Sequence, residues 1–484
     1  MTFNLLDLNS INTNFIKTME NQNRRTFLKN SMITGSAFAI KNPVSLFNSI
    51  GGNRLKEIRI KKVDSNFERE PLIRPFGFKG GYMSEIWQTA SYIKSNSGNH
   101  QIGLCTQNVL WSDANVFSSN SEAAGNSLMY AVTEFALQLI KGHTFYSPVD
   151  LLDEILPEVY SYAKKITSNS NLRKTFALNA LVGVDNALWL LYAQENGFKN
   201  FDQMIPDKYK PCLSYRHENA AAIPLMAYNI PIDEISEAVN QGYFFMKIKI
   251  GQPGTQEEML NKDKVRLSAI HSAIGNVRTK YSKDGKLPYY FDANGRYEKK
   301  ETLMRLLDFA KKIGAFDQIS VIEEPFNETL EIDVSDIPIR LAADESAHTD
   351  KDAIKRIEMG YKAIALKAIA KTLSMTMKIA LAAHERNIPC FCADLTVNPI
   401  LIEWNKNVAS RLKSFPGMNN LGLIESNGHQ NYKNWDKMMS YHPRNSESWV
   451  KAKKGVYQLG RDFYENSGGI FERSSHYENM FLKK

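Results

Sequence analysis

FFMKIKIG, residues 244–251, is a short apolar segment that carries Lys247 and Lys249 in alternate positions. Further apolar segments follow it, and in several of them a charged residue stands at or near the end. These residues are, in chain order, Asp292 in YYFDANGRY, Glu323 in VIEEPF, Asp344 in AADESAH and Lys367 in IALKAIAKT. Short apolar runs are typical of buried strands, so the charges are predicted to gather where neighbouring strands end.

Strand-like segments recur through the second half of the chain, with amphipathic helical stretches between most of them. In residues 301–313, for example, Leu303, Leu307 and Ala310 fall on one helical face. The strand-like segments span 222–229, 243–250, 288–293, 319–324, 339–344, 362–368, 388–394 and 421–425. Strands that alternate with helices in this way predict a parallel α/β barrel. An open, doubly wound sheet would need a glycine-rich phosphate loop after an early strand, and none is evident.

The regions on either side of the barrel differ in composition. Residues 50–210 are predicted to form an α+β domain, with strands and loops over 66–120 and helices after it. Residues 175–197 are apolar on most helical faces and end at a glycine, which predicts a buried helix. Residues 211–435 hold the barrel. The tail, 436–484, is polar and aromatic and is expected to return to the N-terminal domain.

The first 49 residues are typical of a twin-arginine export signal and linker. Arg24-Arg25 is followed by TFLK, a mildly apolar stretch over 31–40 and a small-x-small cleavage motif, AFA. Met19 would leave a compact signal and is a candidate start beside Met1. These features predict a periplasmic protein. A disordered basic tail is the alternative interpretation.

Composition excludes few functions. The net charge of +8 on 484 residues makes no case for nucleic-acid binding, although it is compatible with an anionic substrate. The sequence contains no run of 18 or more apolar residues and therefore predicts no membrane span. The four cysteines do not make a disulfide framework in a chain of this length.

The ordered charges predict a metal site between two bases. Lys247 and Lys249 are two residues apart on a strand and therefore point to the same face. Lysines that face a barrel interior need partners, and the three carboxylates on the next strands would provide them. Carboxylate oxygens suit Mg²⁺ better than zinc. Any one of these residues alone would more often form a surface salt bridge.

The segments KIKIG, FDANGRY, VIEEP, ADES and ALKAIAK together resemble the enolase superfamily, in its muconate-lactonizing and dipeptide-epimerase branch. The resemblance covers residues 55–435 and implies a TIM-type (β/α)7β barrel with an N-terminal α+β capping domain. It implies that Asp292, Glu323 and Asp344 bind Mg²⁺. Lys249 and Lys367 would be the acid/base residues, with Lys247 lending positive charge. Asn294 and Arg296 would support these residues.

The resemblance implies a racemase or epimerase that removes the proton α to a carboxylate and stabilises the resulting enediolate with Mg²⁺. A lysine on each face can remove the proton and return it to the other side. Such a base needs a pKa near the working pH, and we expect burial and nearby cations to lower it. A cycloisomerase or an acid-sugar dehydratase of the same fold is the alternative. A non-catalytic, exported binding protein is an alternative of another class.

The expected substrate is a small carboxylate, such as a dipeptide of the L-Ala-D/L-Glu type. Known dipeptide epimerases carry an Asp-x-Asp pair near the last strand, whereas this chain has LGLIESNGHQ there. Asp394 and Glu425 are therefore candidate substrate residues. Arg74 and Lys79, around the loop FGFKGGY, are candidates for a lid. Members of the family are often oligomeric, so a homo-oligomer is compatible with the resemblance.

Overall fold

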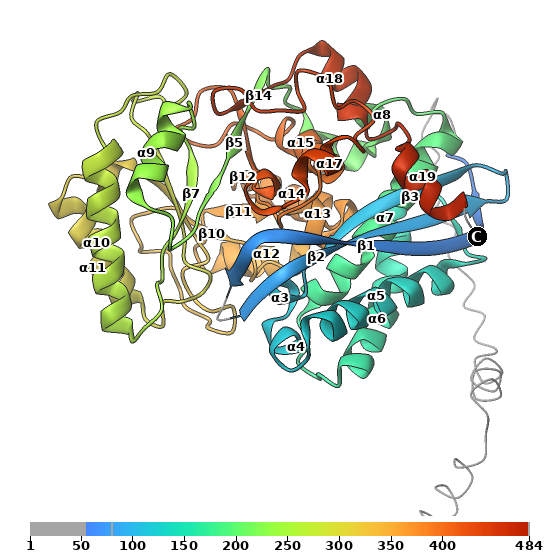
Figure 1. The fold of residues 1–484 in the computed structure, drawn as a ribbon, viewed down its shortest axis with the longest axis horizontal. Coiled ribbons are helices and arrows are strands. Elements are labelled where there is room, and N and C mark those ends of the chain that lie inside the picture. Colours follow the sequence, from blue (N-terminus) through green and yellow to red (C-terminus); the bar gives the residue numbers. More distant parts are fainter. Residues whose placement is uncertain (1–54, 79–80, 483–484) are drawn as a thin grey trace, which may run out of the picture. The chain divides into compact units, whose positions relative to one another are not determined.

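The computed structural model describes residues 55–78 and 81–482, which form a capping domain packed on a β/α barrel (Figure 1). The predicted export signal and Lys79 lie outside the described residues.

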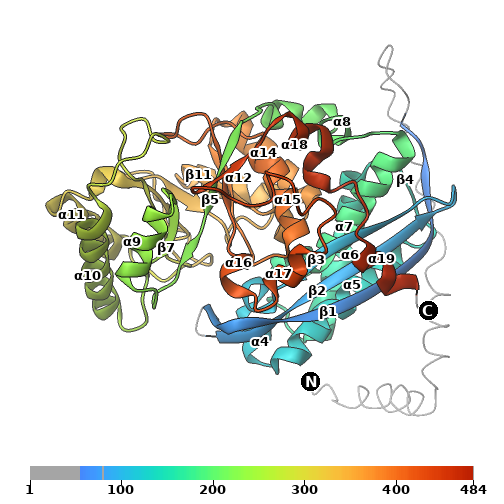
Figure 2. The same ribbon diagram turned by 45° about the horizontal axis from the view of Figure 1, so that its top comes forward.

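The capping domain is built on an antiparallel sheet with strand order β3-β2-β1-β4. Its strands are β1 Ile58–Phe78, β2 Gly81–Ser95, β3 His100–Gln107 and β4 Thr144–Phe145. Its helices are α3 Val109–Ser112, α4 Ala114–Ser118, α5 Glu122–Ile140, α6 Pro148–Thr167 and α7 Lys174–Asn196, followed by α8 Phe201–Met204 and a 3-10 helix, Asp207–Leu213. The two long strands β1 and β2 form the extended hairpin seen in both ribbon views (Figure 2).

Helix α7 confirms the predicted buried helix, and it ends at Gly197 in a left-handed conformation with φ 76°. Among the described helices, α7 alone is long and apolar enough to cross a membrane, but its whole apolar window is buried inside the protein. Such burial is typical of a core helix. Asp185 and Trp189 on its inner face both bond Ser374, the second residue of α14, so α7 also ties the capping domain to the barrel.

The barrel consists of parallel strands in the order predicted. They are β5 Asn219–Ile223, β6 Leu225–Met226, β7 Met246–Lys249, β8 Tyr289–Asp292, β9 Ile319–Glu323, β10 Leu341–Ala343, β11 Ala363–Leu366, β12 Cys390–Cys392 and β13 Gly422–Glu425. β5 pairs with β13 and β6 pairs with β7, with Pro224 between them, so the segment 219–226 closes the ring. This segment begins three residues before the predicted 222–229; the other predicted strands are confirmed in place.

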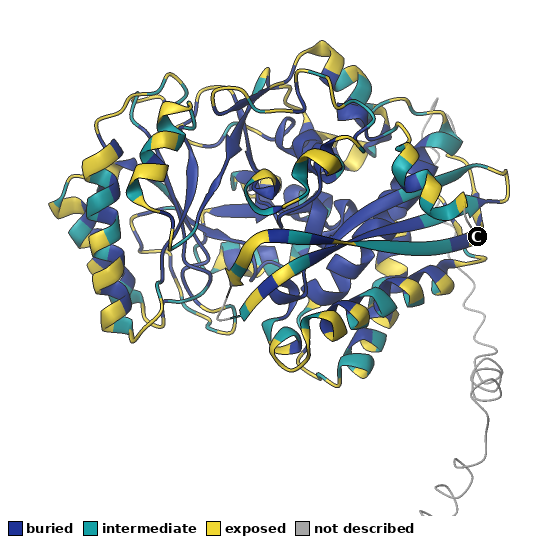
Figure 3. Ribbon diagram, viewed as in Figure 1, coloured by how far each residue is buried: buried dark blue, intermediate teal, exposed yellow. Residues whose placement is uncertain are grey.

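Helices follow most of the strands of the ring. They are α9 Ile232–Asn240, α10 Gln256–Ile274, α11 Lys300–Lys312, α12 Asp350–Glu358, α13 Ala368–Lys371, α14 Leu373–Glu385, α15 Pro399–Ala409 and α16 Gly428–Asn431. Residues 324–340, between β9 and β10, contain no helix. Figure 3 shows buried barrel strands and outer helices α10 and α11 with exposed outer faces. In α11 the buried residues include Leu303, Leu307 and Ala310, as the periodicity predicted.

The remaining elements belong to the C-terminal tail. They are α17 Trp435–Met439, β14 Val456–Gln458, α18 Arg461–Asn466, a 3-10 helix Ser467–Gly469, and α19 Ser475–Leu482. β14 adds an antiparallel strand beside β5. α19 lies against β1, where Asn66 donates a hydrogen bond to the Met480 carbonyl at 3.0 Å and His476 meets Glu68.

Candidate active site

Strand register brings the predicted site residues to one level of the barrel. Lys249 on β7 is paired with Asp292 on β8, and Asp292 is paired with Glu323 on β9. Each of these residues is the last of its strand. Asp344 and Lys367 immediately follow β10 and β11. Because the strands are parallel, all five side chains stand at the carboxyl ends, where active sites of such barrels form.

Lys247 and Lys249 do share a face, and both reach Asp292. The Asp292 Oδ2 atom lies 3.0 Å from Lys247 Nζ and 2.6 Å from Lys249 Nζ. Lys247 also meets Glu323 at 2.8 Å and Glu425 at 3.2 Å. Both lysines are buried, so these contacts supply the partners that a buried ammonium requires.

On the other side of the site, Asp344 is held by two lysines. Lys367 Nζ lies 2.5 Å from Asp344 Oδ2. Lys371, one turn further along at the end of α13, lies 3.3 Å from Asp344 Oδ1 and donates to the carbonyls of Asp344 and Ala347 at 2.6 and 3.0 Å. Lys371 is fully buried and was not predicted. Its only signal in the sequence is its position four residues after Lys367, in ALKAIAK.

The residues present fit a divalent cation. Carboxylate oxygens of Glu323, Asp344 and Glu345 lie within 4.8 Å of one another. The Oε2 atom of Glu345 is buried and has no hydrogen-bond partner among the described residues. An unmatched buried carboxylate oxygen in an all-oxygen cluster is suited to Mg²⁺. Asp292 is not among these three residues, and its Oδ2 atom is paired with Lys247 and Lys249. Glu345, the neighbour of Asp344, is a ligand candidate that was not predicted from the sequence.

Charge pairing controls the ionisation of the site. Burial would raise the pKa of Asp292, but Lys247 and Lys249 outweigh it and lower that pKa to about 2. Burial lowers the pKa of Lys367, as expected, yet the adjacent Asp344 carboxylate outweighs it and leaves that pKa raised. The lowering of the Lys367 pKa by burial is therefore outweighed in this structure, because the nearest group is an anion.

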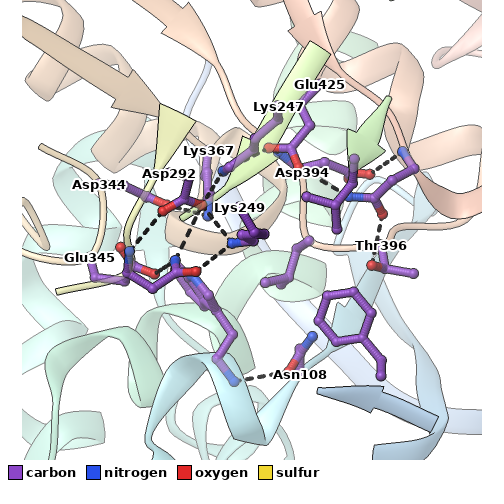
Figure 4. Close-up of a pocket in the computed structure, with 16 residues that line it drawn as sticks. Asn108, Lys247, Lys249, Asp292, Asp344, Glu345, Lys367, Asp394, Thr396 and Glu425 are labelled. Atoms are coloured by element: carbon purple, nitrogen blue, oxygen red, sulfur yellow. Dashed lines mark hydrogen bonds and ion pairs between the residues drawn. The ribbon is translucent and has the colours of Figure 1, made fainter. Parts of the chain in front are cut away.

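A cavity of about 40 Å³ opens above these residues (Figure 4). The barrel contributes Lys247, Lys249, Asp292 and Lys367 to its lining, and the capping domain contributes Phe76, Asn108 and Trp111. The cavity is thus lined by acidic and basic side chains from the barrel and by aromatic and amide side chains from the cap.

The candidate substrate residues are placed differently. Asn294 lines the cavity and donates from Nδ2 to Glu345 Oε1 at 3.0 Å. Arg74 is exposed on β1 and is not among the residues that line the cavity. Arg296 does not line it either; its side chain packs beside Gly251.

Asp394 and Glu425 both line the cavity, but their oxygens are already engaged. Asp394 accepts the backbone N–H of Asn427 at 2.8 Å and that of Val397 at 3.4 Å. Glu425 accepts from Lys247, from the Asp394 N–H at 2.9 Å and from the Asn427 side chain at 3.1 Å. Burial and the nearby Glu425 raise the pKa of Asp394 to about 7. Both carboxylates therefore already have partners, and Glu425 is already paired with the Lys247 ammonium.

No protein-family model and no curated protein matches the sequence. Solved structures match most of the chain. A dipeptide epimerase from Enterococcus faecalis, complexed with Mg and L-Leu-L-Tyr, is 17% identical, with a TM-score of 0.58 over 83% of this chain and 97% of that chain. The L-Ala-D/L-Glu epimerase from Bacillus subtilis is 15% identical, with a TM-score of 0.57 over 83% and 96%.

An N-succinyl Arg/Lys racemase from Bacillus cereus is 14% identical, with a TM-score of 0.56 over 78% of this chain and 89% of that chain. The chain therefore has the fold of the enolase superfamily, as its motifs implied. Within that fold it is similar to dipeptide epimerases and to proteins of the mandelate racemase/muconate lactonizing group.

Proposed function

We propose that this protein is a Mg²⁺-dependent racemase or epimerase that removes and returns the proton α to a carboxylate. The position of Lys249 and Lys367 around the barrel carries this proposal. With β5 and β6 counted as one strand, four steps of the ring separate β7 from β11, which is half-way round. The two lysines therefore enter the same cavity from opposite sides. Groups on opposite faces of one carbon are what inversion requires.

Each lysine has a distinct task in either direction. The neutral amine on one face accepts the α-proton at its Nζ, and the ammonium on the other face donates a proton to the opposite side of the carbon. Lys247, whose pKa is held well above its usual value by Asp292 and Glu323 against the effect of burial, stays protonated and offers its charge to the substrate carboxylate. Glu323 and Asp344, with Asp292 or Glu345, would hold Mg²⁺, which stabilises the charge that develops on the enediolate oxygens.

The substrate class follows from the engaged carboxylates at the ends of β12 and β13. Dipeptides of the L-Ala-D/L-Glu type are the first candidates, because similar structures include dipeptide epimerases. A free dipeptide presents an ammonium group, yet Asp394 and Glu425 already bind backbone N–H groups and Lys247. This observation favours N-acyl amino acids as a second candidate class, and one similar structure is an N-succinyl Arg/Lys racemase. If the predicted export signal operates, the substrate is periplasmic.

Proton exchange in D₂O tests the proposal. The protein with Mg²⁺ would be incubated with pools of dipeptides, N-acyl amino acids and acid sugars, and mass spectrometry would detect deuterium gain. A one-unit gain with inversion is expected. Lys249→Ala and Lys367→Ala should each abolish inversion, and each should retain exchange only for the epimer whose proton the other lysine removes.

Lys311→Ala, which changes an exposed lysine on α11, is the matched control and should leave exchange unchanged. Loss of water in place of exchange would assign a dehydratase, and ring closure would assign a cycloisomerase. Absence of exchange in every pool, despite bound Mg²⁺, would contradict the proposal.

A further inference from the structure

Trp111 joins the two domains at the catalytic cavity. It lies on α3 of the capping domain, yet its side chain lines the cavity of the barrel. The centroid of its ring is 4.4 Å from Lys367 Nζ. Lys367 therefore has Asp344 Oδ2 as an ionic partner and an indole as a second partner. An ammonium at this distance from a tryptophan ring is attracted by the ring electrons, and the attraction grows when water is excluded.

No hydrogen bond of the indole N–H group fixes the position of the Trp111 ring among the described residues. The side chain is buried, and the indole N–H has no hydrogen-bond partner among the described residues. A buried tryptophan usually finds an acceptor for this group, because leaving it unmatched is unfavourable. The Lys367 contact is the polar interaction that this ring makes instead.

The backbone of Trp111 is fixed from the capping domain. Asn108, the N-cap of α3, accepts the Trp111 N–H at 3.0 Å. Arg173, the N-cap residue of α7, donates from Nη1 to the Trp111 carbonyl at 2.8 Å. The backbone that carries the ring is thus fixed by two residues of the capping domain.

We propose that Trp111 is a positioning residue for Lys367. The capping domain supplies an aromatic face that holds this ammonium on its side of the cavity, so that proton transfer on this face of the substrate depends on the cap. The inference deepens the proposed two-lysine function and rests on it for the kinetic test alone. Trp111 would act on the reaction through Lys367.

Two variants distinguish the effect of the aromatic ring from the effect of side-chain volume. Trp111→Phe keeps a ring beside Lys367, whereas Trp111→Leu removes it. Phe76→Leu is the control, because Phe76 also reaches this cavity from the capping domain. With the epimer pair found by the exchange screen, Trp111→Leu should slow the exchange of the α-proton for deuterium about tenfold more for the epimer whose proton Lys367 removes than for the other. Trp111→Phe should keep most of the wild-type rate for both epimers. Phe76→Leu should affect both epimers by the same factor.

Crystal structures of the same variants give a readout that needs no substrate. Lys367 Nζ should keep its position in wild type and in Trp111→Phe, and should move or occupy several positions in folded Trp111→Leu. An unmoved Lys367 in Trp111→Leu, or equal loss for both epimers, would overturn the inference. If the wild type exchanges no epimer, the proposed function fails on its own, and the crystallographic comparison still decides the role of Trp111.

Discussion

Arg173 and Glu328 form a two-point ion pair between the capping domain and the loop that follows β9. Arg173 Nε lies 2.6 Å from Glu328 Oε1, and Nη2 donates to Oε2 at 3.0 Å. The same guanidinium donates to the Trp111 carbonyl and to the Glu345 carbonyl, at 2.8 and 3.2 Å. One side chain thus connects the cap, the predicted metal site and the residue beside Lys367.

Glu328→Gln should destabilise the protein. The change leaves the Arg173 guanidinium, whose side chain is only 13% exposed, without its counter-charge, and removing one partner of a largely buried pair costs about 3 kcal/mol. Urea unfolding would measure the free energy of unfolding. Glu331→Gln, which alters an exposed glutamate of the same loop, should change it by less than about 0.5 kcal/mol. Equal stability of the two variants would contradict a structural role for the ion pair.

The stability that Glu328 provides should disappear in acid. Burial opposes its ionisation, but the hydrogen bond from His348 and the charge of Arg173 outweigh it and hold the pKa of Glu328 below its usual value. The unfolded chain, where a glutamate has a pKa of about 4.3, therefore binds the proton first as pH falls. The contribution is complete above that pH and is lost as pH falls towards the folded pKa. The difference in Tm between wild type and Glu328→Gln should be constant near pH 7, where neither state binds this proton, and shrink below about pH 4.

Mg²⁺ should bind and stabilise the folded protein. Saturation at 100 times the Kd adds about 2.7 kcal/mol, because the unfolded chain does not assemble the carboxylate cluster. Calorimetric titration and Tm would both report binding. Asp344→Asn and Glu323→Gln should lose it, and Asp308→Asn, on the exposed face of α11, should retain it. A titration with Glu345→Gln would decide whether the orphaned oxygen of Glu345 belongs to the site.

Lys371 should be essential for the shape of the β10–α12 loop. Lys371→Met leaves two buried carbonyls and one carboxylate oxygen without their donor, at a cost of about 3 kcal/mol. Chemical denaturation would measure this loss against Lys351→Met, which changes an exposed lysine on α12. A Lys371→Met protein as stable as the control would show that these contacts contribute nothing.

The sequence alone was sufficient to predict the barrel and the positions of most of its strands. Period-two and period-3.6 patterns reflect which faces are buried, and they placed the strands of Lys249, Asp292 and Glu323 correctly. The first strand was predicted three residues late; in the structure the chain is paired on both sides of Pro224, with β13 before it and with β7 after it.

Order along the chain also determined which charged residues reach the carboxyl ends of the strands, since alternation and strand direction are local properties. Contacts between residues far apart in sequence came only from the tertiary structure. The indole of Trp111 beside Lys367, the engagement of Asp394 and Glu425, and the upward shift in the pKa of Lys367 all depend on distances across the cavity. Electrostatic and packing energies vary with these distances in space, and a linear pattern does not contain them.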